Sequence, residues 1–98
     1  MSRQIETAHA GTLESSDAFV RVMPYEGGGI EIELESTVEE IYGDAIRALI
    51  AETIAAMNVE GIKVIVHDKG ALDYVIKARL QTALLRALGQ VEPDWSVL

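Results

Sequence analysis

The sequence predicts an α+β fold: a two-layer sandwich in which a small mixed sheet (a β-hairpin, then β-α-β-α) carries two amphipathic helices on one face. Three observations predict it. Apolar and polar residues alternate in two early segments, a long helical stripe of apolar residues follows, and a short β-branched segment then precedes a second helical stripe. A chain of 98 residues fits one domain with one modest core, which leaves little room for an enclosed substrate cavity.

The strand segments dominate the first third of the chain. Residues 11–14 are expected to form a short strand, and Ser15 and Ser16 a tight turn into a second strand over 18–23. Residues 30–35 alternate strictly, with apolar side chains on one side and glutamates on the other. One face of the sheet is therefore expected to be solvated.

A long helix, a strand and a second helix complete the fold. Thr37 and Glu40 have the spacing of a capping box at the start of the first helix. The β-branched residues 62–67 predict a strand, which should lie parallel to the preceding one because a helix joins them. A second helix is expected over 71–89. The apolar stripe of the first helix comprises Val38, Ile41, Tyr42, Ala45, Ile46, Leu49, Ile50, Ile54 and Met57.

Composition excludes several classes of function. Sixteen acidic against eight basic residues give a formal net charge of −8, which argues against nucleic acid as a partner. No apolar run approaches the roughly 20 residues of a membrane span, and the N-terminus has no apolar leader, so we expect a cytoplasmic protein without membrane contact. The absence of cysteine excludes a disulfide scaffold and a thiolate zinc site. Any thiol chemistry therefore needs a thiol from another molecule.

No catalytic or metal site is expected. His67 and Asp68 are neighbours on a predicted strand, so their side chains should point to opposite faces and cannot form the His–Asp part of a triad. The sequence also lacks a G-x-S-x-G nucleophile elbow. The acidic residues at 31–35 and 39–40 are explained by a solvated strand face and by the first turn of a helix.

Two polar positions remain to be explained. Arg79 lies within the apolar stripe of the second predicted helix, so its guanidinium should pair with a carboxylate such as Asp73 or with a partner group. Ser15 lies between Glu14 and Asp17 in an exposed turn, next to Ser16. Without a base it is a poor nucleophile of its own accord, but it is accessible to another enzyme's transferase. Pattern alone leaves a polar turn and a modification site both open.

Three segments of the chain resemble the acyl carrier protein of citrate lyase, its γ subunit. They are "AGTLESSDA", "YGDAIRALI" and "DKGALDYVIKARLQTALLRA", in order and with suitable spacing, and the match as a whole extends from about Ala10 to Gly89. We therefore expect a single acyl-carrier domain over residues 9–98. Residues 1–8 show no periodicity and are expected to form a flexible N-terminal arm.

The resemblance implies a covalent prosthetic group. In this family the serine of "GTLES" carries 2′-(5″-phosphoribosyl)-3′-dephospho-CoA through a phosphodiester, and the matching residue is Ser15. Ser16 occupies a position where a small residue such as glycine is expected, so it is not the expected attachment point. Glu14 and Asp17 would flank the attachment serine on a surface that a prosthetic-group transferase must reach.

The resemblance also implies a carrier that catalyses nothing itself. The thiol of the attached group would hold acetyl as a thioester. The α subunit of citrate lyase would exchange that acetyl for citrate, and the β subunit would cleave the citryl thioester to oxaloacetate and regenerate the acetyl thioester. A tethered thioester replaces a diffusing intermediate with a high effective concentration at each site.

Three alternatives stay open at this point. The acyl carriers of citramalate lyase and malonate decarboxylase belong to the same functional class. A small adaptor domain without any covalent group would also present an exposed acidic sheet face. Independent enzymatic activity is the weakest alternative, because no catalytic constellation supports it.

Overall fold

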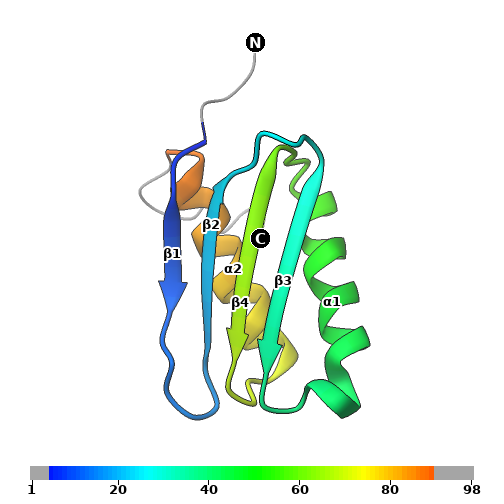
Figure 1. Ribbon diagram of the computed structural model, residues 1–98. Coiled ribbons are helices and arrows are strands. Elements are labelled where there is room, and N and C mark those ends of the chain that lie inside the picture. The colour runs from blue at the N-terminus through cyan, green and yellow to red at the C-terminus, as the bar shows by residue number, and fades with distance from the viewer. Residues whose placement is uncertain (1–4, 90–98) are drawn as a thin grey trace.

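An antiparallel hairpin and a parallel pair of strands share one four-stranded sheet (Figure 1). The computed structural model describes residues 5–89. The predicted mixed sheet and the two-layer α+β architecture are confirmed. The elements are β1 (Ala8–Gly11), β2 (Ala18–Pro24), β3 (Ile30–Ser36), α1 (Glu39–Ala56), β4 (Ile62–Asp68) and α2 (Asp73–Ala87), and the strand order is β1-β2-β4-β3.

The alternation of the strands separates a core face from an open face. In the two central strands, Val20, Val22, Val64 and Val66 are fully buried against the helices. The residues between them face the other side and are exposed or half-buried. β3 pairs with β4 in parallel, as the helical connection predicts, and its three glutamates lie on the open face.

The first strand begins earlier than expected. It covers residues 8–11 instead of 11–14, and Gly11 is its last residue. Gly11 has a φ of +91°, and a Cβ there would stand 1.8 Å from the carbonyl oxygen of Ala18. Extended pairing cannot continue past this close approach, so the chain leaves the sheet at Gly11.

The predicted capping box is wrong. The N-cap residue of α1 is Val38, and no side chain caps it. The backbone N–H of Thr37 donates to the carbonyl of Asp68 at 3.1 Å, so Thr37 belongs to a turn anchored on the end of β4. The hydroxyl of Ser36 accepts from the Val38 N–H at 3.1 Å instead.

The apolar stripe of α1 is buried only in its second half. Ile46, Ile50 and Ile54 belong to the core, whereas Ile41 and Tyr42 in the first turns are exposed. Val38, the first residue of the stripe, packs against the core, so the exposed part of the stripe begins at Ile41. The helix ends as expected near Asn58, which adopts a φ of +56°.

The second helix completes the same core layer. Ile76, Leu80 and Leu84 are buried, while Leu72, the N-cap residue of α2, is exposed. In Figure 1, α2 lies behind the sheet and α1 runs alongside β3. The two helices pack against each other as well as against the sheet.

Of the N-terminal arm expected at residues 1–8, the structure describes residues 5–8. Ile5 packs against the core, the Glu6 N–H donates to the Ala87 carbonyl at 2.9 Å, and Ala8 begins β1. Residues 90–98 of the expected carrier domain lie outside the described residues. Across residues 5–89, no helix has the length and hydrophobicity needed to cross a membrane.

Three connections meet at one end of the molecule. Figure 1 shows the β1–β2 loop, the β3–α1 turn and the β4–α2 turn together at the bottom of the view. The β2–β3 loop and the α1–β4 connection lie at the opposite end. Ser15 is in the β1–β2 loop, so the end with three connections carries the predicted attachment residue.

Candidate functional site: the Ser15 loop

The loop that carries Ser15 is fastened to the rest of the fold by its backbone. Its turn closes when the Asp17 N–H donates to the Glu14 carbonyl at 3.2 Å. The Ser16 N–H donates to the carbonyl of Lys69 at 2.9 Å, and the Lys69 N–H returns a bond to the Asp17 carbonyl at 3.0 Å. These two bonds continue the β2–β4 ladder beyond the strands, so the loop is held against the β4–α2 turn.

The two serines of this turn differ in backbone conformation. Both are exposed, but Ser16 has a φ of +66°, a left-handed conformation that glycine adopts more readily than any other residue. This backbone requirement accounts for the small residue expected at that position. Among residues 5–89, no hydrogen bond engages the Ser15 hydroxyl. A reaction at the Ser15 hydroxyl therefore breaks no hydrogen bond to the described residues.

The carboxylate of Asp17 joins the loop to α2 through hydrogen bonds. It accepts hydrogen bonds from the Thr12 hydroxyl at 2.7 Å, from the Ala18 N–H at 2.7 Å, and from Arg79 Nε at 2.9 Å and Nη2 at 3.2 Å. The bonds from Arg79 and then from Thr12 lower the pKa of Asp17 from 3.8 to about 2. Asp17 is therefore ionised at neutral pH and acts as a structural anchor.

Two expectations about these charges need correction. The expected flanking role of Asp17 at the surface is wrong, because its side chain is only 15% exposed and is engaged in the loop's own hydrogen bonds. Only Glu14 presents an exposed carboxylate beside Ser15. Arg79 does pair with a carboxylate, as expected, but the partner is Asp17 and not Asp73.

Gly11 makes room for this arrangement. A Cβ at Gly11 would collide with the Ala18 carbonyl, and it would also approach the Cδ of Arg79 to 3.2 Å. The glycine therefore lets the two arms of the hairpin come close where the guanidinium passes toward Asp17. Gly11 is the glycine of the segment "GTLES", but its role in the hairpin was not predicted; a glycine at the end of a short strand is a signal for close backbone approach.

A second carboxylate fastens the other two connections at this end. Asp68 is 1% exposed and accepts from the Ser36 hydroxyl at 2.8 Å and from the Ala71 N–H at 2.8 Å. Its side chain thereby joins the β3–α1 turn to the β4–α2 turn. Together, Asp17 and Asp68 stabilise all three connections around the Ser15 turn.

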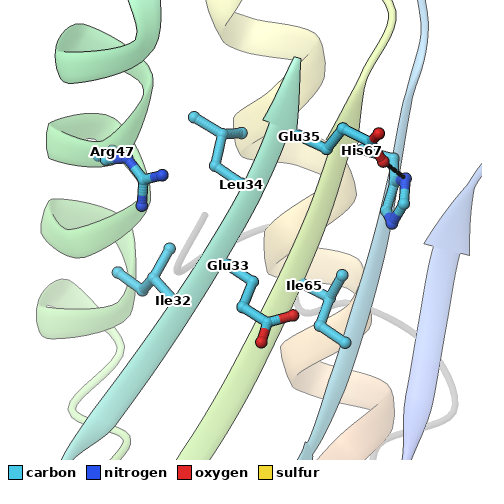
Figure 2. Close-up of a pocket in the computed structure, with 7 residues that line it drawn as sticks. All are labelled: Ile32, Glu33, Leu34, Glu35, Arg47, Ile65 and His67. Carbon is cyan, nitrogen blue, oxygen red and sulfur yellow. Dashed lines mark ion pairs between the residues drawn. The ribbon is translucent and has the colours of Figure 1, made fainter. Parts of the chain in front are cut away.

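A separate, shallow cavity of about 440 Å³ lies along the edge strand β3 and is lined by residues from both sides of that strand. Figure 2 shows Arg47 of α1, residues of β3 and residues of β4 around it, with the Nδ1 of His67 paired to the Glu35 carboxylate at 2.9 Å. His67 faces away from Asp68, as its strand position predicts, so these two residues form no triad. The lining contains no serine, threonine or cysteine.

Within the described part of the chain, no group of three or more histidine, aspartate or glutamate side chains is arranged to hold a metal ion. The Ser15 hydroxyl also has no base bonded to it there. Within residues 5–89, the Ser15 hydroxyl is therefore accessible and has no base hydrogen-bonded to it. That is the property required of a residue modified by another enzyme.

The chain is similar in sequence to known acyl carrier proteins. The family model described as "ACP: Malonate decarboxylase delta subunit (MdcD)" matches residues 5–87. The citrate lyase acyl carrier protein of Vibrio cholerae is 52% identical over 91 residues, which cover 93% of each chain. That of Escherichia fergusonii is 47% identical over 94 residues, covering 96% of this chain and 97% of the relative. Citrate lyase acyl carrier protein 2 of Salmonella paratyphi A is 49% identical with the same coverage.

Two solved structures share the fold. A chain of the Pseudomonas malonate decarboxylase hetero-tetramer in complex with malonate superimposes with a TM-score of 0.72, covering 88% of both chains at 18% identity. Homoserine kinase from Cytophaga hutchinsonii gives a TM-score of 0.59 at 13% identity, and the match covers this whole chain but only 39% of the kinase. Both likenesses concern the fold alone.

Proposed function

This chain belongs to the acyl carrier protein family of citrate lyase, and on that premise we propose that it is the non-catalytic carrier subunit of a citrate lyase. Its proposed partners are the α subunit, which transfers the acyl group, the β subunit, which cleaves the citryl group, and the prosthetic-group transferase. The proposed carrier domain covers residues 9–98; of the arm expected over 1–8, residues 5–8 lie against this domain. Its proposed compartment is the cytoplasm, where such thioester chemistry would take place.

Ser15 is the proposed attachment point of 2′-(5″-phosphoribosyl)-3′-dephospho-CoA. The observation that carries this is the exposed Ser15 hydroxyl, held at the tip of a fastened turn without a hydrogen bond to residues 5–89. Ser16 is also exposed and its hydroxyl likewise has no hydrogen bond among residues 5–89, so the choice of Ser15 over Ser16 rests on its match to the serine of "GTLES". The left-handed backbone of Ser16 fits a position where glycine is expected. When attached, the group supplies the thiol that holds the acyl cargo, which this cysteine-free chain cannot provide.

The attachment step follows from the chemistry of a hydroxyl acceptor. The Ser15 oxygen forms a bond to the phosphorus of an activated phosphoribosyl donor, whose anhydride bond breaks and releases a phosphate leaving group. The serine proton passes to a base of the transferase, because the described residues place none at Ser15. The carrier's part in this step is to hold the hydroxyl in a fixed, open position.

The rigid loop also suits the later work of a carrier. The Asp17–Arg79 pair and the Lys69 backbone bonds fix the point where the prosthetic group is attached, so movement is confined to the prosthetic group itself. Arm attachment at one end of the molecule leaves the sheet and helix surfaces available for subunit contacts. The citrate lyase acyl carrier proteins of Vibrio cholerae and Escherichia fergusonii are 52% and 47% identical to this chain, whereas the matching chain of malonate decarboxylase is only 18% identical. This difference favours citrate lyase over malonate decarboxylase as the enzyme that the carrier serves.

The experiment that tests this proposal is the intact mass of the protein produced with and without its cognate transferase and the activated precursor. We expect a gain equal to one phosphoribosyl dephospho-CoA group, mapped by peptide fragmentation to Ser15. Ser15→Ala should abolish the gain and the matched control Ser16→Ala should keep it. No gain with a demonstrably active transferase, or a gain on Ser16, would overturn the proposal; the first outcome would leave an unmodified adaptor domain.

The assignment to citrate has its own test. The loaded carrier should restore citrate cleavage when it is mixed with citrate lyase α and β subunits, and oxaloacetate formation is the readout. Restoration of citramalate cleavage alone, with citramalate lyase subunits, would assign the carrier to that enzyme instead.

A further inference from the structure

An apolar groove lies beside the Ser15 loop, between the start of α1 and the start of α2. Its volume is about 690 Å³. Its floor and walls are mostly apolar side chains, together with the backbone of the β4–α2 turn. The lining residues are Val38, Tyr42, Ala45, Ile46, Gly70, Ala71, Leu72, Asp73 and Tyr74.

Three of the six large apolar side chains that are exposed in the described fold line the groove. Tyr42, Leu72 and Tyr74 are 55%, 62% and 70% exposed, and all three line it. Ile41, on the same stripe of α1, is 76% exposed. Exposed apolar side chains are ordinary when scattered, but a cluster around a groove marks an interaction surface. The same cluster accounts for the exposed part of the α1 stripe, which begins at Ile41.

The charge around the groove selects the kind of partner. Asp73 is part of the lining, and Glu39 and Glu40 occupy the first turn of α1 beside Val38, with the Glu39 carboxylate 4.0 Å from Arg47. Lys69, next to Gly70, and Arg47, next to Ile46, are the basic residues that adjoin the lining in sequence. No lysine or arginine lines the groove. A polyanionic phosphoribosyl arm would be repelled by this surface, whereas a partner with apolar side chains framed by lysine or arginine would be attracted.

The backbone connects this groove directly to the Ser15 turn. Gly70 lines the groove, and its neighbour Lys69 is the residue whose N–H and carbonyl bond to the loop at Asp17 and Ser16. An enzyme that acts on the Ser15 hydroxyl must place its active site at this end of the molecule. Enzymes that act on the thioester meet it at the far end of a long arm, so they have no need to contact this end.

We propose that this groove is the docking surface for the transferase that loads Ser15, an inference that rests on the proposed function. The transferase fits the required chemistry, because an enzyme that binds a polyanionic donor needs a basic surface around its active site. Its contact on the carrier comprises apolar side chains seated between α1 and α2, with basic side chains facing Glu39, Glu40 and Asp73. The groove fixes the carrier's orientation, and the fastened loop then presents the hydroxyl.

The test measures loading kinetics and binding separately. Tyr42→Ser and Leu72→Ser, alone and together, remove exposed apolar side chains of the groove without touching the core. We expect the double variant to raise the transferase KM for the carrier about tenfold, with kcat within about twofold of wild type. Ile30→Ser is the matched control, because Ile30 is 40% exposed and begins β3 at the opposite end. It should leave both parameters unchanged.

Binding is measured in the unmodifiable Ser15→Ala background by calorimetry with the transferase. The Kd should rise about tenfold with the double groove substitution and stay unchanged with Ile30→Ser. Asp73→Asn should weaken binding and reduce its salt dependence, whereas Glu60→Gln, exposed at the other end, should do neither. Thermal unfolding of each variant shows that it is folded.

The outcomes separate the two proposals. If wild type is not loaded, the proposed function fails. If wild type is loaded at Ser15 and folded groove variants retain its KM and Kd, the docking proposal alone is overturned. A fall in kcat without a change in Kd would also overturn it. If loading shifts the amide NMR signals of the groove while KM is insensitive to the variants, the arm and not the transferase occupies the groove.

Discussion

The guanidinium of Arg79 donates two hydrogen bonds to the carboxylate of Asp17, from Nε at 2.9 Å and from Nη2 at 3.2 Å, although the two residues are 62 positions apart in the sequence. The pair ties the second helix to the β1–β2 hairpin loop. Since the Asp17 carboxylate also accepts hydrogen bonds from Thr12 and Ala18, this one side chain is bonded to both sides of the Ser15 turn. The pair therefore stabilises the fold and also holds the loop that carries the Ser15 hydroxyl.

Removing the guanidinium should loosen the loop without unfolding the protein. We expect Arg79→Ala to lower the free energy of unfolding by about 1–2 kcal/mol, since Arg79 is 43% exposed and its bonds are partly screened by solvent. Arg79→Lys should cost less, because the charge remains while the two-pronged geometry is lost. Urea denaturation measures both. Lys77→Ala, on an exposed position of the same helix, is the control, and an equal cost for Lys77→Ala and Arg79→Ala would contradict the prediction.

The lowered pKa of Asp17 predicts how stability depends on pH. The folded-state value is about 2, against 3.8 for the ordinary group, so the folded state favours the ionised carboxylate. This contribution is fully present above about pH 5 and is lost as the pH falls through 3.8 toward 2. We expect the stability difference between wild type and Asp17→Asn to shrink over that window in urea titrations.

An NMR titration checks the same prediction at the residue itself. The carboxyl carbon of Asp17 should titrate with a midpoint well below 3.8, the ordinary pKa of an aspartate side chain. Arg79→Ala should move the midpoint upward, because the largest cause of the shift is then absent. An ordinary midpoint for Asp17 in the wild type would contradict the role assigned to the pair.

Periodicity was enough to predict the layers of this fold. Alternation at residues 18–23 and 30–35, together with two helical stripes, predicts the sheet, its open face and the helix layer that covers the other side. These features follow from local hydrophobic patterns, and a strand, helix and strand in succession predict the parallel pair. Ser15 was predicted from the resemblance of its surrounding sequence, and its exposure in a turn agrees with that prediction.

Contacts between distant residues could not be predicted in the same way. The pairing of Arg79 with Asp17 depends on how α2 crosses the sheet, and several carboxylates were equally plausible partners from the sequence. The capping box failed for a similar reason, because the Thr37 N–H is already bonded to the Asp68 carbonyl. The exposed half of the α1 stripe has the same apolar pattern as the buried half, so pattern alone could not separate a core from an interaction surface.

Gly11 should be among the least replaceable positions in the loop region. Gly11→Ala places a Cβ 1.8 Å from the Ala18 carbonyl and forces a φ of +91° on a residue with a side chain. We expect a loss of about 2–4 kcal/mol, combining left-handed strain with displacement of the hairpin. Gly28→Ala isolates the strain, because Gly28 has a φ of +73° and nothing within 4 Å of its Cβ position.

The comparison of these two variants by thermal or urea unfolding decides the cause. Gly28→Ala should cost only about 1–2 kcal/mol, the typical cost of a left-handed backbone. If Gly11→Ala were no more costly than Gly28→Ala, the close approach of the hairpin arms would contribute nothing to stability.

Ser16→Gly should stabilise the protein and preserve the candidate site. Ser16 holds a φ of +66°, and the strain of a side chain there is relieved by glycine, although glycine also loses more freedom on folding. We expect a net gain of up to about 1 kcal/mol in the free energy of unfolding. The Ser16 N–H still donates to Lys69, so the turn geometry and the Ser15 hydroxyl should stay in place. Loading of Ser15 by the transferase should therefore proceed at the wild-type rate in this variant, whereas a lost or slowed modification would mean that the Ser16 side chain takes part in recognition.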